Sequence, residues 1–125
     1  MLRLIFIVCL GGSIGSSLRY GAGVWFSRHT HYGFPFATFT VNVVGCFLIG
    51  LFYALSERYH WFSAEWRLLF ITGFCGGLTT FSAFAYENLK LLQEGFTTLF
   101  ILYALGSFVF TLLAVLAGIN SIKLF

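Results

Sequence analysis

Charged residues are scarce in this sequence. They make up 9% of the 125 residues, whereas soluble domains carry about a quarter. Hydrophobic residues make up 59%, and the mean hydropathy is +0.92. A small soluble domain keeps a large share of its area exposed, so it could not hide this much apolar surface from water. The composition excludes a soluble fold and predicts an integral membrane protein.

Several functional signatures are also missing. The sequence has no nucleotide-binding, zinc-binding or nucleophile motif, and no basic tract that would indicate binding to nucleic acid. Its three cysteines, Cys9, Cys46 and Cys75, lie in apolar runs without metal-ligand spacing, which predicts small buried hydrophobic residues. The first apolar run is long and lacks the cleavage site of a signal peptide, so we expect it to remain as a membrane span. We do not expect an enzyme.

Apolar runs account for nearly all of the chain. A helix that crosses a bilayer needs about 20 apolar residues. The predicted spans cover about 4–26, 35–56, 67–92 and 96–122. The only proline, Pro35, suits the first turn of the second span. The prediction is one all-α domain of four membrane helices over residues 1–125.

The loop charges specify the orientation in the membrane only weakly. With an even number of spans, both termini and the middle loop lie on one side. That side carries four cations and the other side two: Arg3, Arg58, Arg67 and Lys123 against Arg28 and Lys90. This small excess of positive charge permits insertion in both orientations, and therefore an antiparallel dimer.

The third predicted span contains a poor helix centre, Gly76-Gly77 followed by Leu78-Thr79-Thr80. Each glycine destabilises a helix by roughly 1 kcal/mol. A break at this depth must be buried in protein or line a cavity, because lipid cannot bond to unpaired backbone groups. Broken membrane helices commonly hold ions with the freed carbonyls. We predict a break in the middle of the membrane; a kinked continuous helix is the alternative.

Two strongly polar side chains, a guanidinium and an amide, lie inside the first two spans. Arg19 would either reach toward the nearer membrane surface or face a water-filled vestibule, where it would attract anions. Asn42 would either hold two helices together or bind an anion through its amide. Gly11 and Gly15, like Gly73 and Gly77, are spaced for close helix packing.

Aromatic and hydroxyl side chains follow a helical spacing in the last two spans. Phe81 and Phe84 share a face, and the positive edges of their rings could contact a small anion, although simple packing also explains the pair. Tyr103, Ser107 and Thr111 form a stripe along the fourth span. Such hydroxyls either bond to their own backbone or replace the water around a passing ion.

In three blocks, the sequence resembles the Fluc (CrcB) fluoride channels, small bacterial membrane proteins that export fluoride. The first matching block is Gly11-Gly12-Ser13-Ile14-Gly15 leading to Arg19-Tyr20. The second is Pro35, Thr38 and Val41-Asn42-Val43-Val44-Gly45. The third and most specific is Gly73-Phe74-Cys75-Gly76-Gly77-Leu78-Thr79-Thr80-Phe81-Ser82, and Glu87 also fits. Three ordered blocks cover nearly the whole chain.

The resemblance implies an antiparallel, dual-topology homodimer with two pores in a bacterial inner membrane. The chain would be a passive channel that exports fluoride and reduces its toxicity. The implied partners are fluoride, the lipid bilayer and a second copy. The implied pore residues are Asn42, Phe81, Ser82, Phe84, Tyr103, Ser107 and Thr111, with Arg19 near the vestibule. The backbone carbonyls of Gly76 and Thr79 would hold a structural sodium ion.

Two positions depart from the family pattern, and two other functions compete with it. Ala37 stands where the motif usually has glycine, and Ala83 where a threonine is expected. We expect conduction to survive because Ser82 and the phenylalanines remain. A fluoride/proton antiporter would need a carboxylate in mid-membrane, for which Glu87 is the only candidate. A non-transporting scaffold would explain the glycines but not the polar stripe.

Overall fold

Four long helical segments make up the computed structural model, which describes residues 1–31 and 33–124. Four helices are long and apolar enough to cross a membrane, over Leu2–His29, Phe36–Arg58, Ala64–Gln93 and Thr97–Lys123. Strands are absent from the described part of the chain. The all-helical prediction and the four spans are therefore confirmed, and each predicted end lies within about three residues of the observed one.

The third span is assembled from several short elements. The first two spans are α1 (Leu2–His29) and α2 (Phe36–Arg58), and the fourth is α6 (Thr97–Lys123). The third begins with α3 (Ala64–Arg67) and continues through a π-helix, η1 (Leu68–Cys75), into α4 (Gly76–Leu78). It resumes as α5 (Ser82–Gln93). Residues 79–81, between α4 and α5, are called the interruption below.

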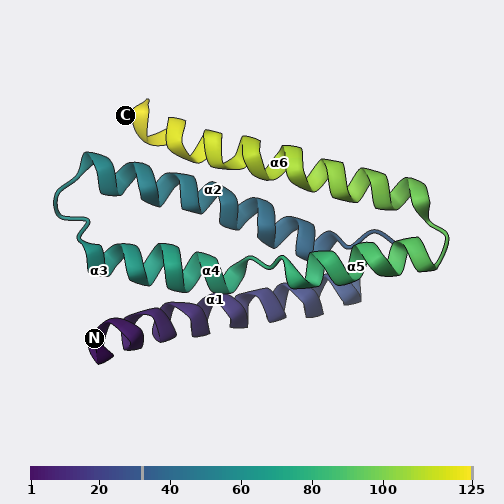
Figure 1. The fold of residues 1–125 in the computed structure, drawn as a ribbon, viewed down its shortest axis with the longest axis horizontal. Coiled ribbons are helices and arrows are strands. Elements are labelled where there is room, and N and C mark those ends of the chain that lie inside the picture. The colour runs from purple at the N-terminus through teal and green to yellow at the C-terminus, as the bar shows by residue number, and fades with distance from the viewer. Residues whose placement is uncertain (32, 125) are drawn as a thin grey trace.

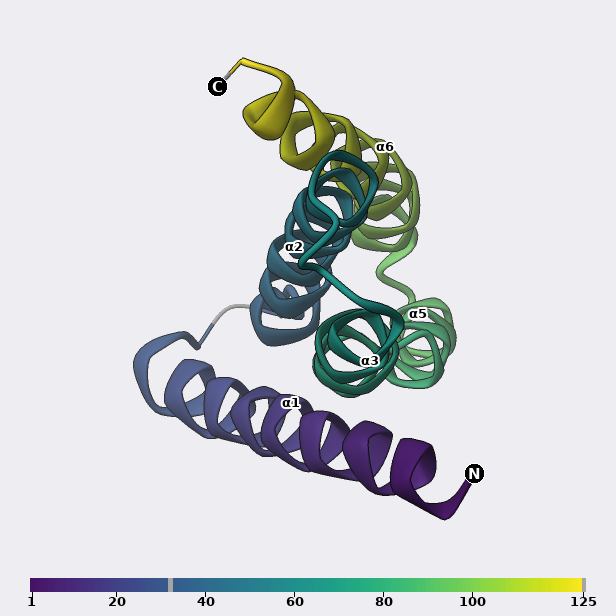
Figure 2. The ribbon, with the colours of Figure 1, turned by 90° about the vertical axis from the view of Figure 1, so that its left-hand side faces the viewer.

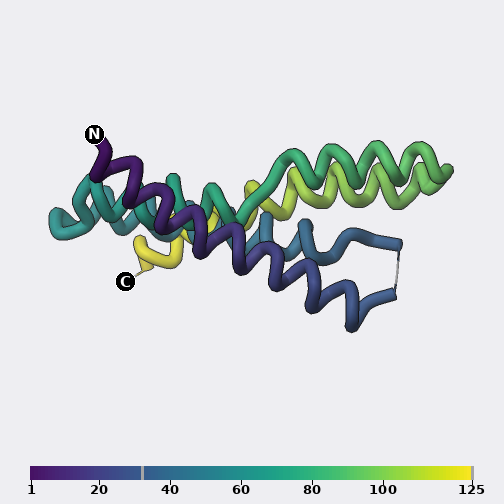
Figure 3. Tube along the Cα trace, turned by 90° about the horizontal axis from the view of Figure 1, so that it is seen from below, coloured from purple at the N-terminus to yellow at the C-terminus, as the bar shows by residue number. Residues whose placement is uncertain are grey.

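The helices are arranged so that the third span lies between α1 and α2, while α2 also packs against α6 (Figure 1). Both termini and the α2–α3 connection lie at the same end of the molecule. The end-on view shows α1 and α6 on opposite sides of the molecule (Figure 2). At the far end, the α5–α6 hairpin separates from the C-terminal end of α1 and the N-terminal end of α2 (Figure 3). The interruption therefore lies within the bundle, between its two ends.

Glycines let α1 and the third span approach to backbone contact. A Cβ at Gly11 would lie 2.9 Å from Phe74 N, and one at Gly73 would lie 2.7 Å from Val8 O. A Cβ at Gly77 would lie 2.5 Å from Gly12 O. These approaches are shorter than real Cβ contacts, so no larger residue fits without moving a helix. The predicted close packing of these glycines is confirmed, and lipid-embedded helices gain contact in this way.

The sequence prediction placed the disruption of the third span on Gly76-Gly77 and the Leu78-Thr79-Thr80 that follow, and the interruption occupies the later part of this segment. Both glycines are helical and form the start of α4. The chain leaves the helix two residues later, where Thr79 is extended with φ −83° and ψ 156°. In lipid the backbone cannot bond to water, so a helical glycine costs less there than in solution. The π-helix before α4 was not predicted.

Candidate functional site

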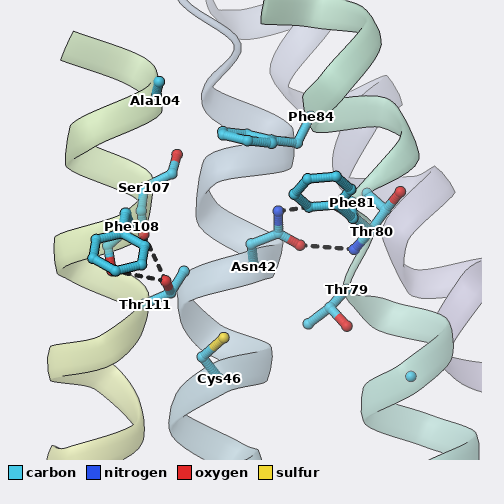
Figure 4. Close-up of a pocket in the computed structure, with 11 residues that line it drawn as sticks. Asn42, Cys46, Thr79, Thr80, Phe81, Phe84, Ala104, Ser107, Phe108 and Thr111 are labelled. Atoms are coloured by element: carbon cyan, nitrogen blue, oxygen red, sulfur yellow. Dashed lines mark hydrogen bonds between the residues drawn. The ribbon is translucent and has the colours of Figure 1, made fainter. Parts of the chain in front are cut away.

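A cavity of about 610 Å³ lies beside the interruption, between α2, α5 and α6 (Figure 4). It contains seven of the site residues predicted from sequence. The residues that line it are Asn42, Cys46, Gly76, Thr79, Thr80, Phe81, Phe84, Ala104, Ser107, Phe108 and Thr111. Arg19, Ser82 and Tyr103, the other predicted site residues, lie outside this lining.

The Asn42 side chain holds the interruption in place. Its Nδ2 donates to the Thr80 carbonyl at 3.0 Å, and its Oδ1 accepts from Thr80 N–H at 2.8 Å. An amide NH₂ group has two N–H donors, and this pair uses one of them. The second N–H remains available, and Asn42 lines the cavity (Figure 4). Asn42 therefore joins two helical segments, as one interpretation predicted. It also lines the cavity, which keeps anion binding by its amide as a prediction.

Arg19 bonds to the end of α4. Its Nε donates to the Gly77 carbonyl at 3.0 Å, across 58 positions of sequence. The carbonyls at the C-terminal end of a helix lack backbone partners, and a cation there is stabilising. Arg19 also lines a second cavity of about 340 Å³ between α1 and α2, together with Thr38, Thr80 and Ala83. Its role in a vestibule remains a prediction.

The aromatic side chains at the start of α5 lie close together. The Phe81 and Phe84 ring centroids are 5.6 Å apart, with the rings tilted by 44°. Phe84 also contacts Tyr103 edge to face, at 5.0 Å between centroids. Phe81 is 78% exposed in the single chain. The pair therefore has one ring held by α6 and one ring that projects outward.

Glu87 on α5 is bound by two hydroxyl groups. The fully buried Tyr103 donates to its Oε2 at 2.7 Å, and Thr38 donates to its Oε1 at 2.6 Å. The sequence prediction gave Glu87 a role only in the antiporter alternative and put Tyr103 in the pore stripe. These hydrogen bonds join α2, α5 and α6, and the pore role of Tyr103 stays a prediction. A carboxylate inside an apolar span was the feature that could have indicated such a network.

The remaining hydroxyls of the predicted pore differ in their partners. Ser107 is 6% exposed, and its Oγ has no hydrogen-bond partner in the described part of the chain. Thr111 donates to its own helix, at 2.6 Å to the Ser107 carbonyl. Ser82 lies 3.2 Å from the Thr80 hydroxyl and is exposed. A buried polar group without a partner is costly, so Ser107 stands out as a donor available to the cavity.

The backbone at the interruption suits a hard cation. In a continuous α-helix Thr80 N–H would donate to the Gly76 carbonyl, but here it donates to Asn42. Gly76 and Thr79 both line the cavity. Backbone carbonyls of unwound membrane helices are the ligands that commonly coordinate Na⁺. The residues present therefore fit the sodium ion that the sequence resemblance implies.

These features define a multi-pass helical membrane protein with a mostly apolar cavity, lined by a few polar groups, beside an interrupted helix. The family model described as CrcB-like protein, Camphor Resistance (CrcB), matches residues 6–119. Among curated proteins, the chain is 41% identical to the Fluoride-specific ion channel FluC of Leptospira interrogans over 98% of this chain and 97% of that protein. It is 46% identical to the protein of the same name from Rhizobium etli over 91% of each. The chain belongs to the family of CrcB-like proteins.

Proposed function

We propose that the protein is a passive, fluoride-selective channel that exports fluoride from the cytoplasm across a bacterial inner membrane and so reduces its toxicity. Relatives that match nearly the full chain carry the name fluoride-specific ion channel. The observation that carries the proposal is the unpartnered, buried Ser107 hydroxyl, which lines the same cavity as Asn42. Two polar donors with spare capacity in an otherwise apolar cavity indicate a small anion.

The chemistry of the cavity matches the needs of fluoride. A channel must replace the water shell of its ion and still bind it weakly enough for release. The Asn42 N–H and the Ser107 hydroxyl provide hydrogen bonds, and Phe81 and Phe84 provide positive ring edges. Along the proposed pathway we also assign Ser82, Thr111 and Tyr103 to the pore and Arg19 to its vestibule. Ala83 lines the second cavity together with Arg19. The threonine hydroxyl that the family pattern has at this position is therefore absent from that cavity.

The active unit in this proposal is a homodimer of two copies in opposite orientations, with two pores and with the interruption in mid-membrane. The weak charge bias of the loops permits both orientations. Phe81, 78% exposed beside the cavity, offers an apolar contact for a second copy. A structural sodium ion held by the Gly76 and Thr79 carbonyls would join the copies at their centre, where packing in lipid lacks a hydrophobic driving force.

We expect the purified protein in liposomes to release fluoride but not chloride, without an applied proton gradient. Phe81→Ile should abolish most of this release, because it removes one aromatic edge from the cavity. Release would be followed with a fluoride electrode after the membrane potential is collapsed by an ionophore.

Phe6→Ile provides a matched control, since Phe6 is exposed on α1 and is not part of the cavity lining. Its release should equal that of the unchanged protein. Equal release from Phe81→Ile would remove Phe81 from the pore. Release that requires a proton gradient would favour the fluoride/proton antiporter with Glu87 as proton carrier. Absence of release by a well-folded protein would favour the scaffold alternative.

We also expect sodium to be needed for dimer integrity. When sodium is replaced by the bulky cation N-methylglucamine, the carbonyls of Gly76 and Thr79 lose their bound ion. The dimer should then dissociate or lose conduction. Cross-linking and efflux would be measured in both salts at equal ionic strength. Dimers and efflux that are identical in the two salts would contradict a structural sodium ion.

A further inference from the structure

The cavity wall contains a thiol that the proposed conduction does not use. Cys46 lies on α2 one helical turn after Asn42, and it lines the same cavity. Figure 4 shows its sulfur directed from α2 toward the side of Thr79. It is the only cysteine in the lining. The sequence predicted all three cysteines to be small buried hydrophobic residues, which is confirmed for Cys75 and wrong for Cys9 and Cys46.

The three cysteines differ in their surroundings. Cys9 is exposed on the outside of α1, and Cys75 on η1 is fully buried. Cys46 is partly exposed. A thiol reacts only where a reagent reaches it. Of the three, Cys46 alone combines access with a position in the cavity, and the unpartnered Ser107 hydroxyl in the same lining marks that cavity as a place for a bound species.

We propose that Cys46 is a modification site in the cavity wall, at which small thiol-specific electrophiles bind covalently and block conduction. The blocking step rests on the proposed channel function. A group added to Cys46 occupies space one turn from Asn42 and adds apolar atoms where an ion needs donors. The cavity of about 610 Å³ has room for a small reagent to enter.

The probe is methyl methanethiosulfonate. The Cys46 thiol loses its proton to water, and the thiolate attacks the sulfenyl sulfur of the reagent. The bond between the two reagent sulfurs breaks, methanesulfinate leaves with the electron pair, and a methylthio group remains on Cys46 as a mixed disulfide. Dithiothreitol reduces that disulfide and restores the thiol.

The test uses the full chain in liposomes. Peptide mass mapping reports which cysteines are modified, and fluoride efflux is compared with that of the same variant untreated. We expect modification of Cys46 and a loss of efflux of about tenfold, the effect of ~1.4 kcal/mol on a barrier. Dithiothreitol should restore the rate. Cys46→Ala should keep its own untreated rate in the reagent, although Cys9 is modified in both proteins.

Cys46→Met supplies a second, permanent test, because methionine has the same number of side-chain heavy atoms as the methylthio product. Its untreated efflux should fall to the level of the modified protein. An unmodified Cys46, a modified Cys46 with unchanged efflux, or equal inhibition of Cys46→Ala would each overturn the proposal. If the untreated protein releases no fluoride, the channel function itself fails, while mass mapping still decides whether Cys46 is accessible.

Discussion

Gly15→Ala is expected to push α1 away from the third span and to lower the free energy of unfolding. A Cβ at Gly15 would collide with the Phe74 carbonyl oxygen and lie 2.8 Å from Leu78 N. Both obstacles are backbone atoms, which cannot swing aside as a flexible side chain can. Overpacking in a well-packed core typically costs about 1–3 kcal/mol and occasionally more, and the rigid backbone here favours the upper end. Thermal unfolding of the purified protein in detergent would measure the loss.

Gly21→Ala is the matched control on the same helix. A Cβ at Gly21 meets nothing within 4 Å. Alanine favours helix over glycine by roughly 1 kcal/mol, so this variant should unfold at the same temperature as the unchanged protein or slightly above it. If Gly15→Ala unfolded at the temperature of Gly21→Ala, the close contact between α1 and the third span would be wrong.

Asn42→Asp is expected to stop fluoride release while leaving the chain folded. Aspartate has nearly the same shape and keeps an oxygen that can accept from Thr80 N–H. It loses both amide N–H groups, the one that donates to the Thr80 carbonyl and the one left for the cavity, and places a carboxylate in the cavity. Two like charges 4 Å apart repel by about 4 kcal/mol at an effective dielectric constant of ~20. That energy corresponds to roughly a thousandfold slower passage, measured as fluoride efflux from liposomes.

Two further variants separate the new charge from the lost hydrogen bonds. Asn120→Asp introduces the same charge at an exposed position near the end of α6 and should release fluoride normally. Asn42→Ala removes the amide without adding charge, so its rate should fall between those of Asn42→Asp and the unchanged protein. Efflux from Asn42→Asp within a few fold of normal would show that anions do not pass Asn42.

The parts of the fold that could be predicted depend on local sequence. Apolar runs fix the number and ends of the spans because a bilayer demands helices of a certain length. The glycine spacing in α1 and in the third span predicted that each would pack closely against another helix, since residues four apart share a helix face. That the two helices contact each other was not predicted. The matching seam between α2 and α6, where a Cβ at Gly50 would lie 3.1 Å from Ile119 N, was not predicted. Its glycines, Gly50 on α2 and Gly118 on α6, each lack a second glycine four residues away on the same helix.

The sequence predicted which residues belong to the site better than it predicted their hydrogen bonds. Asn42, Phe81, Phe84 and Ser107 were predicted to be together, and all line the cavity. Their partners were not predicted, because hydrogen bonds across tens of residues depend on how the helices pack. Arg19 and Gly77 are one example, and the pair of hydroxyls on Glu87 is another. The pore roles themselves remain predictions.

The bond between Arg19 and Gly77 also has a consequence for biosynthesis. The ribosome makes α1 first, and the carbonyl that Arg19 contacts follows 58 residues later. Until then a guanidinium in the centre of a lone helix would cost about 2.5–3.5 kcal/mol on insertion scales. Arg19 lies in the C-terminal half of α1. Its long side chain can therefore reach toward the membrane surface nearer to that end of the helix. Once α4 has been made, the hydrogen bond from Arg19 to the Gly77 carbonyl can offset part of that cost.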